Sequence, residues 1–184
     1  MHCFCHPLDS ETICCHPLIL ETRTLTWPDE AACAHTAVLL ARTLSQPQAL
    51  TTGPVDARIE LLGPLGAGKT TFVRHLLQAL GVTGRIKSPT YTVMEAYALP
   101  GGLGEAAHFD FYRFNDPREW LDAGFRDVFA RPVLSLCEWP DKAAGQLPLA
   151  DLRLQIEPLD ESARQVMLSA HTRRGAAWLQ AGWP

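Results

Sequence analysis

Apolar residues recur at helical spacing in two stretches of the chain. The first stripe consists of Ala31, Ala34, Val38 and Leu39. It predicts a helix that ends near Leu44, with Thr26 as its cap and Pro28 in its first turn. The second stripe consists of Phe72, Val73, Leu76, Leu77 and Leu80. It predicts a helix over residues 69–80 that Gly81 closes.

Shorter apolar runs between turn residues predict strands. They cover residues 58–62, 91–98, 105–111, 133–137, 152–156 and 166–169. Residues 45–56 are expected to form a loop, a short helix should follow Asp116, and the tail from Arg173 should be helical. Strands that alternate with helices predict an α/β fold, a mixed sheet with parallel central strands flanked by helices.

Composition limits the class of protein. A chain of 184 residues with 47% hydrophobic residues suits one globular domain. The net charge of −4 argues against a general nucleic-acid footprint, which needs a basic face. No apolar run approaches the length of a membrane span, and the N-terminus lacks the basic start of a signal peptide. We therefore expect a cytoplasmic protein without a membrane partner.

The first residues differ from the rest of the chain. A Cys-His-Pro-Leu unit occurs twice there, and Cys and His are concentrated at Cys3, Cys5, His6, Cys14, Cys15 and His16. A zinc site is one interpretation, but adjacent cysteines in one short segment fit structural zinc spacing poorly. We predict a divergent, disordered extension over residues 1–23 and a single domain over residues 24–184.

A glycine-rich loop joins the predicted strand 58–62 to the predicted helix 69–80. Gly63, Gly68, Lys69 and Thr70 match the pattern G-x-x-x-x-G-K-[ST] in the strand–loop–helix context that it requires. In such a loop, backbone N–H groups surround phosphate, the lysine reaches the β- and γ-phosphates, and the hydroxyl ligates Mg²⁺. The nucleotide-binding residues expected here are Gly63, Leu65, Gly66, Ala67, Gly68, Lys69, Thr70 and Thr71. This predicts a small P-loop NTPase fold.

A phosphate loop of this kind needs an acidic residue at the end of another core strand. Glu138 follows the apolar strand 133–137 and is the first candidate for the Mg²⁺ site, together with Thr70. Asp110 ends another strand and is the second candidate. The hydroxyl-rich loop over residues 87–92 could place a hydroxyl near the γ-phosphate. No [NT]-K-x-D motif for guanine is present, so ATP is the expected nucleotide.

These motifs together resemble the TsaE (YjeE) family, the P-loop ATPase of bacterial tRNA threonylcarbamoyladenosine biosynthesis. The resemblance rests on five segments in order, namely residues 63–71, Lys87-Ser88-Pro89-Thr90-Tyr91-Thr92, His108-Phe109-Asp110-Phe111-Tyr112-Arg113, Gly124-Phe125-Arg126-Asp127 and Glu138-Trp139-Pro140. It covers residues 26–170. Pro64 stands where the family commonly has Asp, and the segment before residue 24 has no counterpart.

The resemblance implies weak ATP hydrolysis that supports the TsaD–TsaB complex in modifying tRNA, with tRNA contacted indirectly through that complex. It implies that Lys69, Asp110 and Glu138 act in catalysis, that Thr70 and Glu138 hold Mg²⁺, and that Glu30 contacts the nucleotide. Two alternatives stay open at this point. Arg113, Arg118, Arg126 and Arg131 could form the lid of a small-molecule kinase. The chain could also be a non-catalytic module whose partner binding ATP controls.

Overall fold

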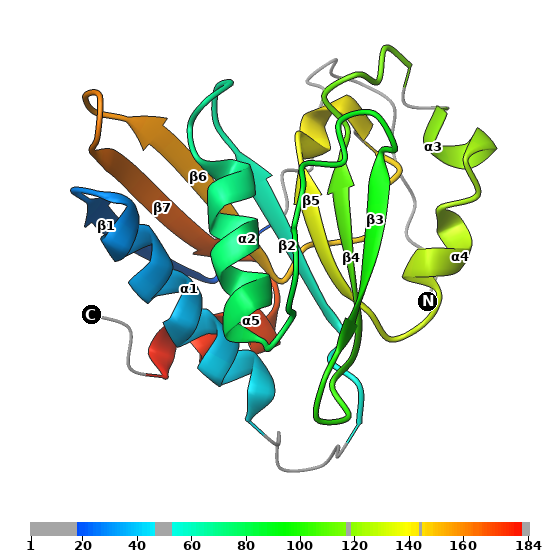
Figure 1. Ribbon diagram of the computed structural model, residues 1–184, viewed down its shortest axis with the longest axis horizontal. Helices are drawn as coiled ribbons and strands as arrows, with labels where there is room; N and C mark the ends of the chain where they lie inside the picture. The colour runs from blue at the N-terminus through cyan, green and yellow to red at the C-terminus, as the bar shows by residue number, and fades with distance from the viewer. Residues whose placement is uncertain (1–17, 47–52, 117–118, 144, 182–184) are drawn as a thin grey trace, which may run out of the picture.

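One seven-stranded sheet organises the molecule (Figure 1). The computed structural model describes residues 18–46, 53–116, 119–143 and 145–181. The strands are β1 (Glu21–Trp27), β2 (Ala57–Leu62), β3 (Met94–Leu99), β4 (Gly104–Asp110), β5 (Leu134–Glu138), β6 (Leu152–Pro158) and β7 (Arg164–Ala170). Their order across the sheet is β1-β7-β6-β2-β5-β4-β3.

Parallel pairing holds the centre of the sheet together. β2 pairs in parallel with β5 and with β6, and β4 pairs in parallel with β5. The outer pairs β1–β7, β6–β7 and β3–β4 are antiparallel, and the last two are hairpins. The predicted mixed α/β sheet is confirmed. The carboxyl ends of β2, β4 and β5 meet at one edge, where a ligand site is expected in such folds.

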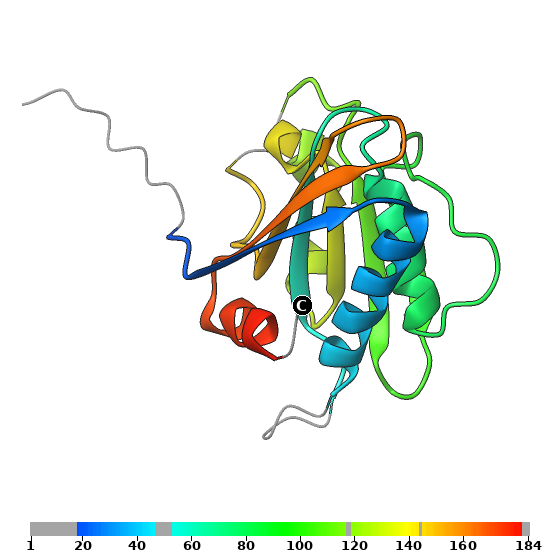
Figure 2. The same ribbon diagram turned by 90° about the vertical axis from the view of Figure 1, so that its left-hand side faces the viewer.

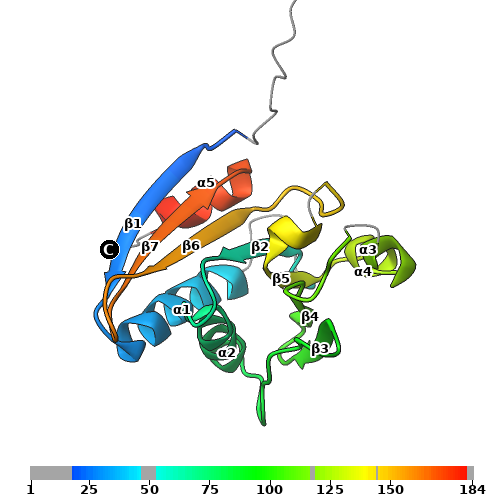
Figure 3. The same ribbon diagram turned by 90° about the horizontal axis from the view of Figure 1, so that it is seen from above.

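Helices cover both faces of the sheet. They are α1 (Glu30–Ser45), α2 (Lys69–Ala79), α3 (Glu119–Asp122), α4 (Arg126–Phe129) and α5 (Arg173–Gln180), with a 3-10 helix η1 (Pro140–Ala143). α1 and α2 lie on one face, whereas α5, α3 and α4 lie on the other (Figures 2 and 3). In the described part of the chain, no helix is long and apolar enough to cross a membrane.

The alternation of side chains along β4 divides the core into two clusters. Ala106 belongs to the large cluster under α1 and α2, and Phe109 belongs to the smaller aromatic cluster under α3 and α4. His108 and Asp110 therefore point to the α1–α2 side, as Ala106 does. This places two polar side chains of β4 toward the loop that precedes α2.

The start of the domain differs from the sequence prediction. β1 begins at Glu21 and pairs along its whole length with β7, so the boundary after residue 23 cuts the first strand. Thr26 lies inside this strand rather than at a helix end. Asp29 is the actual cap of α1, because its carboxylate accepts a hydrogen bond of 2.9 Å from Ala32 N. Residues 1–17 of the extension predicted over residues 1–23, including its Cys and His residues, lie outside the described residues.

Other predicted elements are confirmed with shifted ends. The strand expected over residues 91–98 begins later, at Met94, because Val93 has a φ of 64° and donates its N–H to Pro89 O. The strands expected over residues 152–156 and 166–169 are β6 and β7, and the expected final helix is α5. The sequence pattern did not predict α4 and η1, which are single turns of four residues each.

Candidate functional site

The loop between β2 and α2 has a backbone that only glycine accommodates at three points. Gly63, Gly66 and Gly68 have φ values of 133°, 78° and 109°. A side chain at Gly63 would also overlap the Ile156 carbonyl oxygen. Arg164 Nε donates a hydrogen bond of 3.1 Å to Ala67 O and so ties the loop to β7. The sequence thus fixes a tight, concave loop before the first turn of α2.

Lys69 is 4% exposed and points back over this loop. Its Nζ donates hydrogen bonds to Gly63 O at 2.7 Å and Pro64 O at 2.8 Å, and it lies 3.9 Å from the centroid of the Trp139 ring. Burial lowers the pKa of Lys69, and the nearby carboxylates, chiefly Glu138, oppose this effect. The ammonium group is therefore held by groups that an anionic ligand could replace.

Glu138 ends β5 and is almost completely buried, at 2% exposed. Thr70 Oγ1 donates to its two carboxylate oxygens at 2.8 and 3.0 Å. His108 Nε2 lies 2.8 Å from Glu138 Oε1. The residue after a phosphate-loop lysine and the residue at the end of a neighbouring strand thus form one hydrogen-bonded group of hard oxygen donors, the kind that Mg²⁺ prefers.

Asp110 ends β4 beside Glu138, its register partner on β5. Asp110 Oδ2 accepts hydrogen bonds from Ser88 Oγ at 2.9 Å and Thr90 Oγ1 at 2.6 Å. Its Oδ1 accepts one of 3.0 Å from Tyr112 N. The carboxylate therefore anchors the hydroxyl-rich loop at the same edge of the sheet as the glycine-rich loop.

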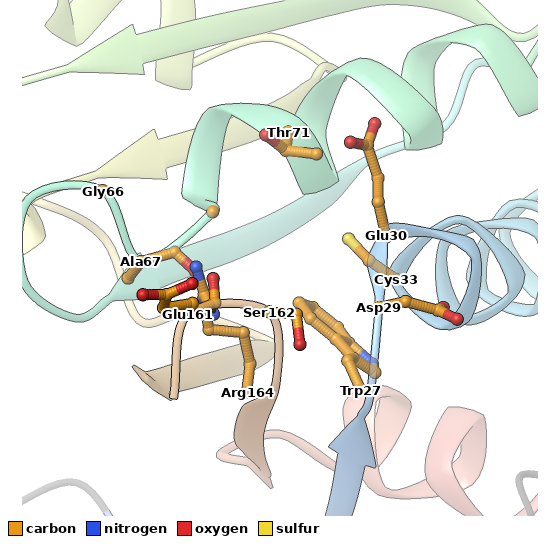
Figure 4. A pocket seen from close by; sticks show the side chains of 11 residues that line it. Trp27, Asp29, Glu30, Cys33, Gly66, Ala67, Thr71, Glu161, Ser162 and Arg164 are labelled. Carbon is orange, nitrogen blue, oxygen red and sulfur yellow. Dashed lines mark hydrogen bonds between the residues drawn. The ribbon is translucent and has the colours of Figure 1, made fainter. Parts of the chain in front are cut away.

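A cavity of about 250 Å³ touches the start of the glycine-rich loop at Gly63 and Pro64. Two further cavities flank the end of this loop. The smaller, of about 200 Å³, is lined by residues that include Lys69, Thr70, Ser88, Thr90, Asp110, Tyr112, Glu138 and Trp139. The larger, of about 330 Å³, is lined by Trp27, Asp29, Glu30, Cys33, Gly66, Ala67, Gly68, Thr71, Glu161, Ser162 and Arg164 (Figure 4). Both are lined by Gly66, Gly68 and Thr71, so they flank one loop.

The wall of the larger cavity comes from segments that are distant in the sequence. Glu30 stands in the first turn of α1, and its Oε1 lies 3.0 Å from His75 Nε2 on α2. Cys33, one turn further along α1, is 4% exposed, and burial raises the pKa of its thiol to about 12. Cys33 therefore packs as a small apolar residue at neutral pH rather than as a thiolate.

The structure brings together the residues selected from the sequence for the site, apart from Arg113, Arg126 and Arg131. The fourth arginine, Arg118, lies outside the described residues. Gly63 and Leu65 lie in the loop, and Glu30 lies across the larger cavity from Gly66 (Figure 4). Arg113 stacks instead on the exposed Tyr91 ring, and Arg131 pairs with Glu105 at 2.6 Å. Neither arginine lines the two cavities beside the loop.

Part of the site carries no recognisable signal in the sequence. Trp27, Cys33, Glu161 and Arg164 line the larger cavity, but they come from β1, α1 and the β6–β7 hairpin and share no motif. The contact between His108 and Glu138 was also missed. Its only signal was that His108 and Asp110 share one face of a strand that ends at the site.

A loop with this pattern between a parallel strand and a helix is typical of the class of α/β proteins with a phosphate-binding loop. The model of the family "Threonylcarbamoyl adenosine biosynthesis protein TsaE" matches residues 27–166. The chain belongs to the TsaE family, and membership assigns it to threonylcarbamoyladenosine biosynthesis.

Individual relatives agree with this assignment. The tRNA threonylcarbamoyladenosine biosynthesis protein TsaE of Haemophilus influenzae is 44% identical over 117 residues, which are 64% of this chain and 72% of the relative. The TsaE protein of Bacillus subtilis is 34% identical over 112 residues, or 61% of this chain and 68% of the relative. The crystal structure of Bacillus subtilis YdiB aligns with a TM-score of 0.67 at 24% identity, covering 87% and 93% of the two chains, and supports the fold.

Proposed function

We propose that this chain binds Mg-ATP and hydrolyses it weakly, as an accessory protein that supports the TsaD–TsaB complex in forming threonylcarbamoyladenosine on tRNA. The observation that carries the proposal is the hydrogen-bonded pair of Thr70 and Glu138 beside Lys69. A phosphate loop, its lysine and two oxygen donors at one strand edge are the parts that nucleotide hydrolysis by P-loop proteins requires.

The two cavities suggest how ATP would lie. Phosphates would occupy the loop and the smaller cavity near Lys69, where backbone N–H groups and the start of α2 favour negative charge. The nucleoside would occupy the larger cavity, whose volume of about 330 Å³ and Trp27 wall suit a base and a sugar. Glu30 lines this cavity, in agreement with the nucleotide contact that the family resemblance implies.

The donor set of the smaller cavity fits Mg²⁺. The Thr70 hydroxyl and the Glu138 carboxylate are oxygen donors that converge at the loop. Bound magnesium would supply positive charge against the phosphate oxygens. Two protein donors leave further positions for water and phosphate, which is how Mg²⁺ is usually held in nucleotide sites.

The other side chains would position the reacting groups. Lys69 would move its hydrogen bonds from the Gly63 and Pro64 carbonyls to phosphate oxygens. Asp110 has both carboxylate oxygens engaged, so we infer that it acts by holding Thr90 and Ser88 at the cavity. Its part in catalysis would then be to place a hydroxyl where the attacking water and the γ-phosphate meet.

The proposed setting is the cytoplasm, where ATP and tRNA are available. TsaD and TsaB are the proposed protein partners, on the basis of family membership. The acidic balance of the chain, with a net charge of −4, favours a protein partner over direct tRNA binding.

Phosphate release from ATP, measured with and without TsaD–TsaB, tests the proposal. We expect release that the partners stimulate, and its loss in Lys69→Ala and Glu138→Ala variants that still melt cooperatively. ADP formation that depends on a small-molecule acceptor would instead indicate a kinase. Nucleotide-dependent partner binding without turnover would indicate a gated module. Full turnover in Lys69→Ala, or no binding to TsaD–TsaB in any nucleotide state, would overturn the proposal.

A further inference from the structure

The burial of the His108 side chain is unfavourable in free energy. The side chain is fully buried in β4, and its Nε2 is 2.8 Å from Glu138 Oε1. Its Nδ1 is buried and has no hydrogen-bond partner in the part of the chain that the structure describes. Burying an imidazole costs more free energy than burying an apolar side chain of that size. The hydrogen bond to Glu138 offsets part of this free energy.

We propose that His108 is a positioning residue for the magnesium–nucleotide complex, because it fixes the Glu138 carboxylate in the orientation that a cation beside Thr70 needs. Since a carboxylate oxygen accepts hydrogen bonds, the imidazole donates through Nε2–H. His108 thereby holds Oε1 from the sheet side. The Thr70 hydroxyl lies against both carboxylate oxygens, at 2.8 Å from Oε1 and 3.0 Å from Oε2, so His108 adds its hydrogen bond to Oε1 and leaves Oε2 to Thr70. This inference rests on the proposed function.

The elements that hold the carboxylate explain why two donors are needed. Thr70 approaches from the first turn of α2, whereas His108 approaches from β4, the strand that pairs with β5. Lys69 is also close enough for the charge of Glu138 to act on it. Without the imidazole, Oε1 would keep only the Thr70 hydroxyl, and the carboxylate could turn toward the Lys69 ammonium. Its oxygens would then no longer be set for a cation.

A comparison of two amide substitutions isolates this hydrogen bond. His108→Gln places an amide nitrogen near the position of Nε2, whereas His108→Asn reaches only to the position of Nδ1. Both variants introduce the same amide group, so they differ only in how far it reaches. We would measure the affinity of the full chain for ATP in excess EDTA and in Mg²⁺ by titration calorimetry, and use the ratio of the two dissociation constants as the readout. Thermal melting would verify folding.

We expect His108→Asn to reduce the magnesium-dependent gain in affinity by about 10-fold, the usual effect of removing a partner of a metal ligand. Affinity in EDTA should stay unchanged, and His108→Gln should keep most of the gain. Should His108→Asn not fold, His108→Met fills the same volume without a donor and should show the same loss. In a protein that already carries Glu138→Gln, adding His108→Asn should not reduce the magnesium-dependent gain in affinity any further.

A folded His108→Asn or His108→Met protein with the wild-type gain would overturn the inference. Equal losses in EDTA and in Mg²⁺ would also overturn it, since they indicate a purely structural role. If the wild-type chain itself gains no affinity from Mg²⁺, the proposed function fails together with this inference. A wild-type gain that survives all three substitutions contradicts the role of His108 alone.

Discussion

Two buried carboxylates lie at opposite ends of the sheet, and their surroundings differ. Asp151 and Glu138 are each 2% exposed. Asp151, at the amino ends of β2 and β6, accepts hydrogen bonds from Arg58 N, from the Thr172 hydroxyl and from two nitrogens of Arg174. Glu138, at the carboxyl end of β5, accepts from a hydroxyl and an imidazole, and it lines a cavity.

The difference separates a carboxylate that holds the fold together from one that we propose binds a ligand. Arg174 neutralises Asp151 directly at 2.7 Å, and Thr172, which caps α5, completes the set, so the group joins the last helix to the sheet. Within the described residues no arginine pairs with Glu138, and its carboxylate lines a cavity where we propose a cation binds. Equal burial therefore does not indicate equal roles. The hydrogen-bond partners of each carboxylate indicate whether its role is structural or in binding.

Asp151→Asn should produce the largest change and should affect stability alone. The substitution keeps one acceptor oxygen but removes the charge that pairs with Arg174. We expect the free energy of unfolding to fall by about 3 kcal/mol, because the buried amide nitrogen would face Arg58 N and Arg174, which are both donors. Urea denaturation measures this, and ATP affinity under native conditions serves as the control. A weakened ATP affinity in the folded variant would show that the two ends of the sheet are coupled.

Glu138→Gln should have the opposite effect, a loss of activity with little change in stability. The amide oxygen can still accept from Thr70 and His108, so we expect the free energy of unfolding to change by less than about 1 kcal/mol. ATP hydrolysis should fall by about 100-fold, because the negative charge that would face the proposed magnesium ion is gone. Phosphate release, measured beside the urea midpoint, decides this. Hydrolysis at the wild-type rate would place Glu138 with the structural carboxylates.

The threonines that serve each carboxylate offer a matched pair. Thr172→Ala removes both a donor to Asp151 and the cap of α5, so it should cost about 1 kcal/mol of stability and leave hydrolysis intact. Thr70→Ala should lower hydrolysis by about 10-fold and barely alter melting. Both effects can be measured on the same preparations. The comparison fails if each variant shows the other's phenotype.

Glu60 is a third buried carboxylate, and its effect on the pH dependence of stability should be smaller than the effects at Asp151 and Glu138. It lies mid-sheet on β2 and pairs with Arg153 at 2.6 Å, yet burial raises its pKa. A raised pKa means that the folded state holds the proton more tightly, so this group lowers stability as pH rises from about 4 through the folded pKa. The stability of Glu60→Gln relative to wild type should therefore increase across that window. Urea midpoints at several pH values measure it, and a flat difference would contradict this expectation.

Most of the fold follows from local signals in the sequence. The glycine-rich loop located β2 and α2, and the apolar strand before Glu138 located β5. β1 was missed because its partner, β7, lies far along the chain, and the Cys/His repeat drew residues 21–23 into the extension. The cap of α1 was misplaced because Thr26 and Asp29 are both good capping residues. Only the pairing of β1 with β7 shows that Thr26 belongs to a strand, which leaves Asp29 as the cap.

The site was predictable only where strand ends and motifs coincide. The pairing of Thr70 with Glu138 was expected, since both belong to the edge at which parallel strands end. The larger cavity was not, because β1 and the β6–β7 hairpin meet the glycine-rich loop only through the sheet order. The bonds of Asp110 to Ser88 and Thr90 likewise depend on the path of a loop, which periodicity does not describe.

Pro64 gives the glycine-rich loop an unusual property. Its ring fixes one backbone angle, and its carbonyl already accepts hydrogen bonds from Ala67 N at 3.2 Å and Lys69 Nζ at 2.8 Å. A loop restrained in this way has fewer conformations to lose when a ligand orders it, so less entropy opposes binding. Proline also has no N–H to offer phosphate. This chain thus exchanges one hydrogen-bond donor for a loop that is shaped in advance.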